Sequence, residues 1–485
     1  MIRRTLFNWF YSRNRFAEAL AWCKYHTGPR SSSELYACYR LCLYETVANS
    51  RRGDGHWRGG FAVAVSLAAC GRDGEAAELA RALVAQHRLG AHQVVLADAL
   101  APFALELALE LIEHVDAPLG LRAALLLRVG QDGQAAGLLN EALAAGQTRQ
   151  QPALNLLLSN AAPGPAQQQL ARMNAFFAAY ALTPVALRDA SLPPGQMNMT
   201  SVAPHQSVRG PLVSVLMTAF QSGQRIGFAI TSLLEQTYRD IEVIVVDDAS
   251  GDDTGKVVQA LAARDPRVVY IRLPCNVGTF VAKSIGLRHS SGEFVTCHDS
   301  DDWSHPMRIE RQIRPLLENQ RLVFTTSLWV RIQDDGAYYA RPVHPLMRLN
   351  PASPLFRKNK VLERAGGWDA VRTGADSEFF ARLKLVFGQR AMHRVAQPLT
   401  LGAHRPDSLM TATDTGYSTT GMSPTRLAYW EGWGHHHINE LRAGRKPYVP
   451  VDLLAERRFA APDAIVVPRR NIEMCLALCE PSRHG

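Results

Sequence analysis

Four short apolar runs, each followed by a stretch long enough for a helix, are the feature that most constrains the fold of this chain. The runs are VSVLMTAF, IEVIVVD, VVYIRLP and EFVTC, and they lie between Val213 and Cys297. Amphipathic stretches such as residues 225–238 and 253–264 separate them. Continuous Val- and Ile-rich strands that alternate with helices are typical of a parallel sheet covered on both faces. The sequence therefore predicts an α/β domain with a mostly parallel sheet.

Two acidic clusters follow two of these runs. Asp247 and Asp248 end the second run, and the sequence Asp-Ser-Asp-Asp at 299–302 follows the fourth. Because ligands of such sheets bind beyond the carboxyl ends of the strands, we expect both clusters at one edge. Three neighbouring carboxylates repel each other unless water or a cation offsets their charge. We therefore expect a site for Mg²⁺ or Mn²⁺ and a diphosphate, with an acidic turn that caps the next helix as the alternative.

The region before this domain has a helical composition. Ala and Leu dominate residues 17–187, and β-branched runs are few. The motif GRDGEAA at Gly71 returns as GQDGQAA at Gly130, and each copy lies between two apolar stretches. This repeat predicts stacked helical hairpins similar to degenerate tetratricopeptide units. We expect an all-α, helical-repeat domain over residues 1–190 that either docks a protein partner or simply packs on its neighbour.

The remaining divisions follow changes in composition. Residues 191–210 are rich in Pro, Gly and Ser without periodicity, which predicts a linker or strap. We place the α/β domain at residues 211–410 and a C-terminal extension at residues 411–485. The extension contains aromatic and basic residues, but its sequence assigns it no chemistry.

Charge and hydropathy bear on the partners and the location. The 485-residue chain has a formal net charge of +9, which favours anionic partners, and it contains no apolar run of about 18 residues. We expect a cytoplasmic protein that binds a nucleotide diphosphate and no nucleic acid. The first stretch places Arg3 and Arg4 beside Leu6 and Trp9. It is therefore either an ordinary packed helix or a peripheral contact with the inner face of the cell membrane.

With these motifs in this order, residues 211–409 resemble the family 2 glycosyltransferases, whose nucleotide-sugar-binding domain has the Rossmann-like GT-A fold. VSVLMTAF is similar to the first strand and donor loop of that family. The resemblance implies that Thr218, Ala219 and Phe220 contact the nucleotide. VVDDAS is similar to the nucleotide-recognising motif, which implies contacts from Asp247 and from Asp248, with Asp248 on the base.

The next two motifs concern the diphosphate and the metal. Asn276-Val-Gly, followed by Ala-Lys283, is similar to a helix start whose cation lies near the diphosphate in the family. HDSDDW corresponds to the family's Asp-x-Asp motif. The resemblance implies that Asp299 and Ser300 contact the nucleotide sugar, and that Asp299 and Asp301 bind the metal, supported by the neighbouring Asp302.

Two later segments complete the resemblance. GADSEF is similar to the family's catalytic-base segment, which implies that Asp376 is the general base, although Ala375 stands where the family commonly has Glu. An inverting transfer needs such a carboxylate to take the proton of an acceptor hydroxyl, and a helix N-terminus favours its ionised form. LGAHRP lies where many members have a His that closes the metal site. This implies His404 as a metal ligand, with Arg405 as a diphosphate contact left open.

The sequence as a whole leads to one main hypothesis and two alternatives. We expect an inverting glycosyltransferase dependent on Mn²⁺ or Mg²⁺, with a nucleotide-diphosphate sugar donor and a saccharide or lipid-linked saccharide acceptor. By family analogy, its setting is bacterial surface polysaccharide synthesis. The alternatives are a nucleotidyltransferase on a similar sheet, with residues 221–225 as its glycine-containing loop, and a helical-repeat adaptor with an inactive transferase domain.

Overall fold

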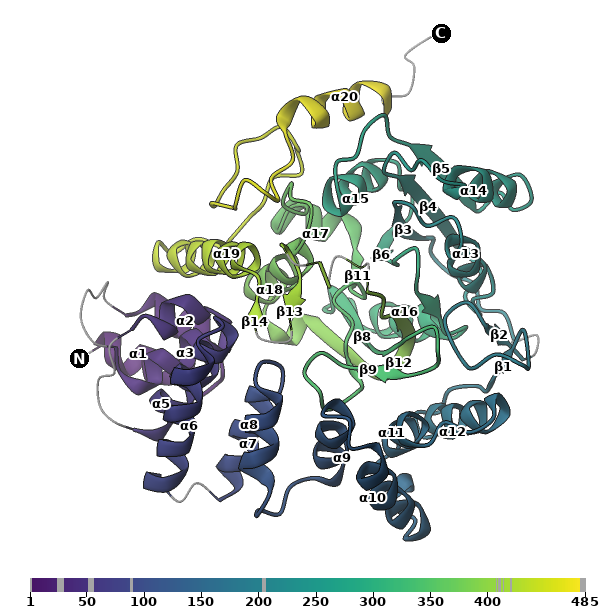
Figure 1. Cartoon of the computed structure of the whole chain (residues 1–485). Coiled ribbons are helices and arrows are strands. Elements are labelled where there is room, and N and C mark those ends of the chain that lie inside the picture. The colour runs from purple at the N-terminus through teal and green to yellow at the C-terminus, as the bar shows by residue number, and fades with distance from the viewer. Residues whose placement is uncertain are drawn as a thin grey trace.

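The computed structural model describes residues 2–23, 30–50, 56–87, 90–202, 206–406, 408, 411–412, 414–418 and 421–479. Figure 1 shows the N-terminal helices in an arc along one side of a large sheet domain, running from α1 near the late helix α19 to α12 near β1 and β2. Residues 409 and 410, at the predicted end of the α/β domain, lie outside the described residues.

The N-terminal region is helical, as predicted. Its helices are α1 (Ile2–Tyr11), α2 (Phe16–Ala21), α3 (Ser32–Arg40), α4 (Tyr44–Ala48), α5 (Trp57–Ala69), α6 (Asp73–His87), α7 (Ala91–Leu100), α8 (Leu105–Ile112), α9 (Leu119–Arg128), α10 (Asp132–Ala144), α11 (Leu154–Ala161) and α12 (Ala166–Ala178). The two copies of the repeated motif form the same turn, from α5 into α6 and from α9 into α10. Gly71 and Gly130 have φ angles of 74° and 77°, which explains the glycine at this position in both copies.

The predicted linker is a packed strap. β1 (Val185–Leu187) pairs antiparallel with β2 (Met199–Ser201), so one strand of this small sheet lies within residues 191–210. The side-chain amide of Gln196 donates to Asp334 of the sheet domain at 2.8 Å. Residues 203–205 of the predicted linker lie outside the described residues.

The large sheet is parallel in its first half, as predicted, and contains antiparallel strands in its second half. Its strands are β3 (Val213–Ala219), β4 (Ile241–Asp247), β5 (Val268–Arg272), β6 (Phe294–Cys297), β7 (Trp303–Ser304), β8 (Phe324–Ile332), β9 (Tyr338–Tyr339), β10 (Arg348–Leu349), β11 (Leu355–Arg357) and β12 (Met392–Ala403). The main order is β5-β4-β3-β6-β11-β8-β12-β7. The first four strands are parallel, whereas β11 runs antiparallel to both β6 and β8. The sheet is therefore mixed in its second half.

Helices cover both faces of the parallel half. They are α13 (Ile226–Leu234), α14 (Thr254–Ala262), α15 (Thr279–Arg288) and α16 (Arg308–Glu318). Val215 and Val243 share a buried cluster with Ile226 of α13, while Leu216 and Ile244 share another with Ile285 of α15. Neighbouring strand residues point to opposite faces of the sheet. Because both sets are buried, both faces of these strands are covered. This explains why the strands read as unbroken apolar runs.

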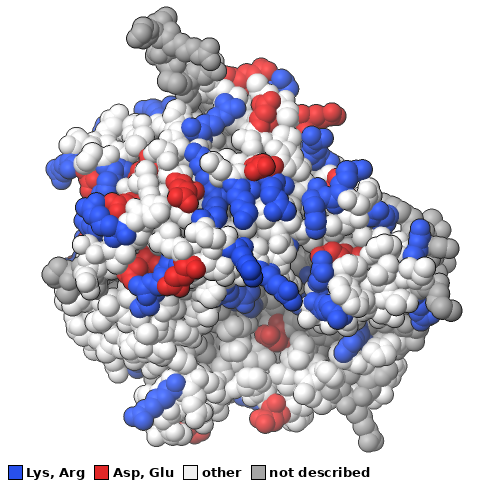
Figure 2. Space-filling model, turned by 180° about the vertical axis from the view of Figure 1, so that it is seen from behind, with Lys and Arg blue, Asp and Glu red and all other residues white. Residues whose placement is uncertain are grey.

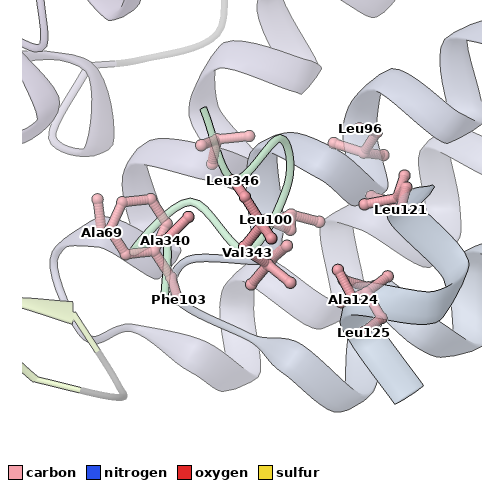
Figure 3. Packing of buried hydrophobic residues seen from close by; sticks show 14 of the residues in the cluster. Ala69, Leu96, Leu100, Phe103, Leu121, Ala124, Leu125, Ala340, Val343 and Leu346 are labelled. Atoms are coloured by element: carbon pink, nitrogen blue, oxygen red, sulfur yellow. The ribbon is translucent and has the colours of Figure 1, made fainter. Parts of the chain in front are cut away.

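The helical region and the sheet domain share one hydrophobic core. Figure 3 shows Ala340, Val343 and Leu346, from the segment after β9, among residues of the helical region that include Leu100 and Phe103. A second contact joins the two parts, because the side chain of Asn160 and the backbone of Tyr338 exchange two hydrogen bonds of 2.8 Å. The boundary at residue 190 stays a prediction. The shared core indicates that the two parts stabilise each other.

The C-terminal region contacts both parts. It contains β13 (Tyr417–Ser418), β14 (Gly421–Met422), α19 (Pro424–Arg442) and α20 (Arg469–Cys479). The carboxylate of Glu431 on α19 accepts hydrogen bonds from the backbone and hydroxyl of Thr46 on α4. The remaining helices of the sheet domain are α17 (Lys358–Arg364) and α18 (Ala375–Phe387), and α18 packs against α19.

The surface charge is uneven. Figure 2 shows Lys and Arg side chains gathered across the middle of the face behind Figure 1, with fewer Asp and Glu side chains among them. This distribution fits the expectation of an anionic partner. Within the described ranges, no helix has the length and apolar character needed to cross a bilayer.

Candidate active site

The acidic clusters meet at the carboxyl edge of the parallel strands, where they are expected. The backbone N–H of Asp248, after β4, donates to the carbonyl of Ala219 at the end of β3, at 2.8 Å. The backbone N–H of His298, after β6, donates to Leu216 of β3 at 3.0 Å. The central position of β3 between β4 and β6 therefore brings the two acidic segments to one edge.

Asp247 and Asp248 hold the loops of this edge. The two carboxylate oxygens of Asp248 accept from the backbone N–H groups of Val277 and Gly278, each at 2.7 Å. Asp247 accepts from the N–H of Ser250 at 2.8 Å, and from the hydroxyl of Tyr270 at 2.7 Å. Burial raises the pKa of Asp248, although the two backbone donors oppose that shift. The predicted contacts of both residues with a nucleotide stay predictions.

The predicted donor loop is strained and partly open. Phe220 is 51% exposed, whereas Ala219 is buried and Thr218 is half-buried. Gln221 directly after it has φ = 52°, and Ala249 on the neighbouring loop has φ = 63°. Non-glycine residues in this left-handed region are costly and cluster at functional sites. The two strained loops are joined by a hydrogen bond from Gln221 to Ser250.

Lys283 and Asp299 form an ion pair between two distant segments of the chain. Lys283 on α15 is only 5% exposed on its side chain, and its Nζ lies 3.6 Å from Oδ1 of Asp299, which is 41% exposed. Burial alone would lower the pKa of Lys283. The electrostatic effects of Asp299, Cys297 and Asp376 are larger, and the pKa is raised. A buried cation thus faces one carboxylate of the Asp-x-Asp motif, and the predicted base acts on the same cation.

Asn276 lies in the loop that precedes α15. Its amide donates to the backbone carbonyl of Asp248 at 3.3 Å, and its carbonyl accepts from the guanidinium of Arg372. A side chain at Gly278, where φ is 77°, would meet the backbone of Arg372. The segment before α18 therefore packs directly on the predicted nucleotide loop. The sequence did not single out Arg372, because nothing in a single chain shows that residues 276 and 372 meet.

The rest of the acidic motif is paired within the protein. Arg405 donates a hydrogen bond from Nε to Oδ2 of Asp301 at 3.0 Å, and its Nη2 lies 2.9 Å from the same oxygen. Burial raises the pKa of Asp301 despite this guanidinium, and Asp299 adds to the rise. Asp302 is buried and accepts from the backbone N–H of Ala403 at 2.9 Å. The hydroxyl of Ser300 lies 2.9 Å from that of Ser222, two residues after the donor loop.

Asp299 and Asp301 form a donor set that a divalent ion fits. Two nearby carboxylates raise the energy of each other's charged form, and a cation relieves that repulsion. Mg²⁺ in particular is usually bound by one or two carboxylates, water and substrate phosphates. Oδ1 of Asp301 is not used by Arg405. Among the residues that the structure describes, no group of three or more His, Cys, Asp or Glu side chains is arranged to hold a metal ion.

His404 lies near the positively charged Arg331 and Arg128. Its ring stacks on Tyr339 with 3.5 Å between the ring centroids, and its buried Nδ1 has no hydrogen-bond partner within the described part of the chain. Burial, together with the positive charges of Arg331 and Arg128, lowers the pKa of His404 to about 4. Positive neighbours do not favour a bound cation. The metal role of His404 stays a prediction that none of its described contacts supports.

Asp376 and Glu378 have different surroundings. Asp376 lies in the first turn of α18, is half-buried, and accepts from the backbone N–H of Ser377 at 2.8 Å. Glu378 is completely buried and paired with Arg382 at 2.7 and 2.8 Å and with His437 at 2.8 Å. Of these two carboxylates, only Asp376 is accessible to an acceptor hydroxyl.

Comparison with known proteins supports the motif assignment. Residues 214–380 match the model of the family described as Glycosyl transferase family 2. An uncharacterized glycosyltransferase of Haemophilus influenzae is 34% identical over 115 residues, which cover 24% of this chain and 46% of that protein. The UDP-Glc:alpha-D-GlcNAc-diphosphoundecaprenol beta-1,3-glucosyltransferase WfaP of Escherichia coli is 31% identical over 116 residues, covering 24% and 45%.

A solved structure shows a weaker likeness. TarS 1-349 of S. aureus, in complex with UDP-GlcNAc, is 17% identical with a TM-score of 0.37, covering 48% of this chain and 65% of that chain. The chain spans about half the length of the two curated relatives it matches.

The sheet edge and its motifs lie in the part of the chain that matches this family model, behind an all-α region. Residues 214–380 are therefore similar to a family 2 glycosyltransferase domain.

Proposed function

We propose that this protein is a metal-dependent, inverting glycosyltransferase that moves a sugar from a nucleotide-diphosphate sugar to a hydroxyl group of a saccharide or lipid-linked saccharide. The observation that carries this proposal is the ion pair between the buried Lys283 and Asp299 at the carboxyl edge of the sheet, where the charge of Asp376 also acts on Lys283. Such a transfer requires positive charge for the diphosphate and a carboxylate for the acceptor proton.

The residues divide between donor and acceptor. We assign the nucleoside to the loop 218–220 with Asp247, Asp248 and Asn276, and the diphosphate to Lys283 and Arg405. The fork of a guanidinium matches phosphate oxygens, and an ammonium supplies a compact charge. Asp376 would take the proton of the acceptor hydroxyl, since it is a half-buried carboxylate in the first turn of α18.

Asp299 and Asp301 would hold the divalent ion, Mn²⁺ or Mg²⁺, with Ser300 and Asp302 as their support. When bound, such an ion neutralises the charge that develops on the departing nucleoside diphosphate. The pairing of Arg405 with Asp301 keeps that carboxylate oriented within the site.

The family match favours this proposal over nucleotidyltransfer. The presence of Asp299, Asp301 and Asp376 together counts against an inactive adaptor. The name of the WfaP relative describes transfer of glucose to a lipid-linked sugar. This supports bacterial surface polysaccharide synthesis as the setting of the present protein, and a lipid-linked saccharide as one class of acceptor. Contact with a membrane or with a protein partner through the helical region remains a prediction.

Donor binding should require the divalent ion through Asp301. We expect calorimetric titration with UDP or GDP to show affinity in Mn²⁺ that falls at least tenfold in chelator, because the diphosphate and the ion complete each other's coordination. Asp301→Ala should remove the effect of Mn²⁺. The exposed Asp132, on α10, provides the control: Asp132→Ala should bind as the wild type does. Equal affinity with Mn²⁺ and with chelator would disprove the metal requirement.

A further inference from the structure

A cavity lies between the helical region and the sheet domain, apart from the site described above. Its volume is about 280 Å³, and its lining combines Arg128 from the end of α9, Arg331 from β8, Arg341 from the segment after β9, and His404 after β12. Tyr339 and Tyr417 also line it. Ligand pockets in proteins start at about 300 Å³, so this cavity suits one sugar ring or one charged group rather than an oligosaccharide.

Three guanidinium groups converge on the cavity without a carboxylate among its described lining residues. Arg331 is only 7% exposed, and its Nη2 donates to the carbonyl of Ala403 at 2.8 Å. The guanidinium of Arg128 lies 4.1 Å from the ring centroid of Tyr339, and that of Arg341 lies 3.9 Å from that of Tyr417. Burying positive charge without a paired anion is costly. The lining is therefore complementary to an anion.

Two buried polar atoms of the same lining have unmet hydrogen-bonding capacity. Nε of Arg341 and Nδ1 of His404 are both buried and have no hydrogen-bond partner among the residues that the structure describes. Buried polar atoms are normally paired, and each exception calls for a reason. An oxyanion in the cavity would accept from the guanidinium N–H groups that line it, and an N–H at Nδ1 of His404 would add one donor.

The cavity adjoins the candidate active site. Ala403 connects the two: its carbonyl accepts from Arg331, and its N–H donates to Asp302 of the acidic motif. The next residue, His404, lines the cavity, and Arg405 beyond it pairs with Asp301. The fields of Asp302, Asp301 and Asp299 also act on Arg331. A group bound in the cavity would therefore lie beside the place where the sugar is transferred.

We propose that this cavity binds a phosphate or carboxylate group carried by the sugar acceptor, so that the enzyme selects anionic saccharides. This inference rests on the proposed function, because only a glycosyltransferase has a sugar acceptor. The helical region supplies Arg128 and thus takes part in acceptor choice, because the cavity is complete only where α9 meets the sheet domain.

Binding of small anionic sugars to the full-length protein tests the proposal without any donor or metal. By calorimetry, we expect glucose 6-phosphate or glucuronate to bind and glucose not to bind. Arg341→Gln and Arg128→Gln should each weaken the binding about tenfold or more, because each removes a charge-assisted hydrogen bond. Arg149→Gln provides the matched control, since Arg149 is exposed on the helical region away from the cavity.

Three results would overturn the proposal. The first is that neither anionic sugar binds better than glucose. The second is that Lys283→Gln, rather than the two cavity variants, removes the binding, which would place the anion at the donor site. The third is that inorganic phosphate binds as tightly as glucose 6-phosphate, which would make the ligand a free anion. Circular dichroism checks that each variant is folded. If Arg341→Gln does not fold, Arg128→Gln alone tests the proposal.

The same measurements separate this proposal from the proposed function. Metal-dependent binding of UDP or GDP reports on the donor site alone, whereas binding of anionic sugars reports on the cavity alone. A protein that binds the nucleotide and no anionic sugar retains the proposed function and refutes the cavity assignment. The reverse result refutes the donor site.

Discussion

Asp376→Asn is expected to lower turnover by about 10² to 10⁴, the usual value of general-base assistance, while donor and metal affinity stay unchanged. The substitution keeps the shape of the side chain, and its amide oxygen still accepts the hydrogen bond from Ser377. It removes only the group that takes a proton. The measurement is turnover at saturating donor and acceptor, together with calorimetric titration of the nucleotide.

The matched control for this prediction is Glu363→Gln on α17. Glu363 is an exposed carboxylate outside the site, so the same chemical change there should leave turnover within twofold of the wild type. If Asp376→Asn retains near-normal turnover, then Asp376 is not the base. A parallel loss of nucleotide affinity would instead indicate that Asp376 holds the donor through Lys283.

Glu378→Ala is expected to lower the free energy of unfolding by roughly 3–5 kcal/mol, the usual cost of removing one partner of a buried ion pair. The guanidinium of Arg382 would keep its bonds to the carbonyls of Ala365 and Gly367 but lose its only carboxylate partner among the described residues. His437 would lose its 2.8 Å contact. Denaturant unfolding measures the change, and Glu363→Ala serves as the exposed control.

The contribution of Glu378 should also depend on pH. Burial would raise its pKa, but Arg382 and His437 outweigh burial and lower it to about 2, from 4.5. A depressed folded-state pKa stabilises the protein above the unfolded pKa, and this contribution is lost as the pH falls through the folded value. The stability difference between the wild type and Glu378→Ala should thus be full near pH 7 and shrink between about pH 4.5 and 2. A difference that is constant over that range would contradict the ion-pair assignment.

Local patterns in the sequence determined the parallel half of the sheet and its functional edge. The runs at β3, β4 and β6 are mostly apolar because both faces of these strands are buried, whereas β5 is a partly exposed edge strand. Side chains that follow parallel strands meet at one edge, so the nearness of Asp248 and Asp299 could be expected from topology alone. The turns at Gly71 and Gly130 could also be predicted from the sequence, because a positive φ angle is a local requirement that favours glycine.

Only the tertiary structure decided which partner each charged residue takes. Asp376 and Glu378 are two residues apart, yet one is accessible and the other is buried against His437, because α19 packs on α18. Arg405 pairs with Asp301, and the cavity joins Arg128 to Arg331, across segments with no common sequence signal. The sequence by itself determined the strands, the turns and the motifs, because these depend on neighbouring residues. The surroundings of Asp376 and Asp301 and the arginine-lined cavity depend on contacts between distant residues, which only packing establishes.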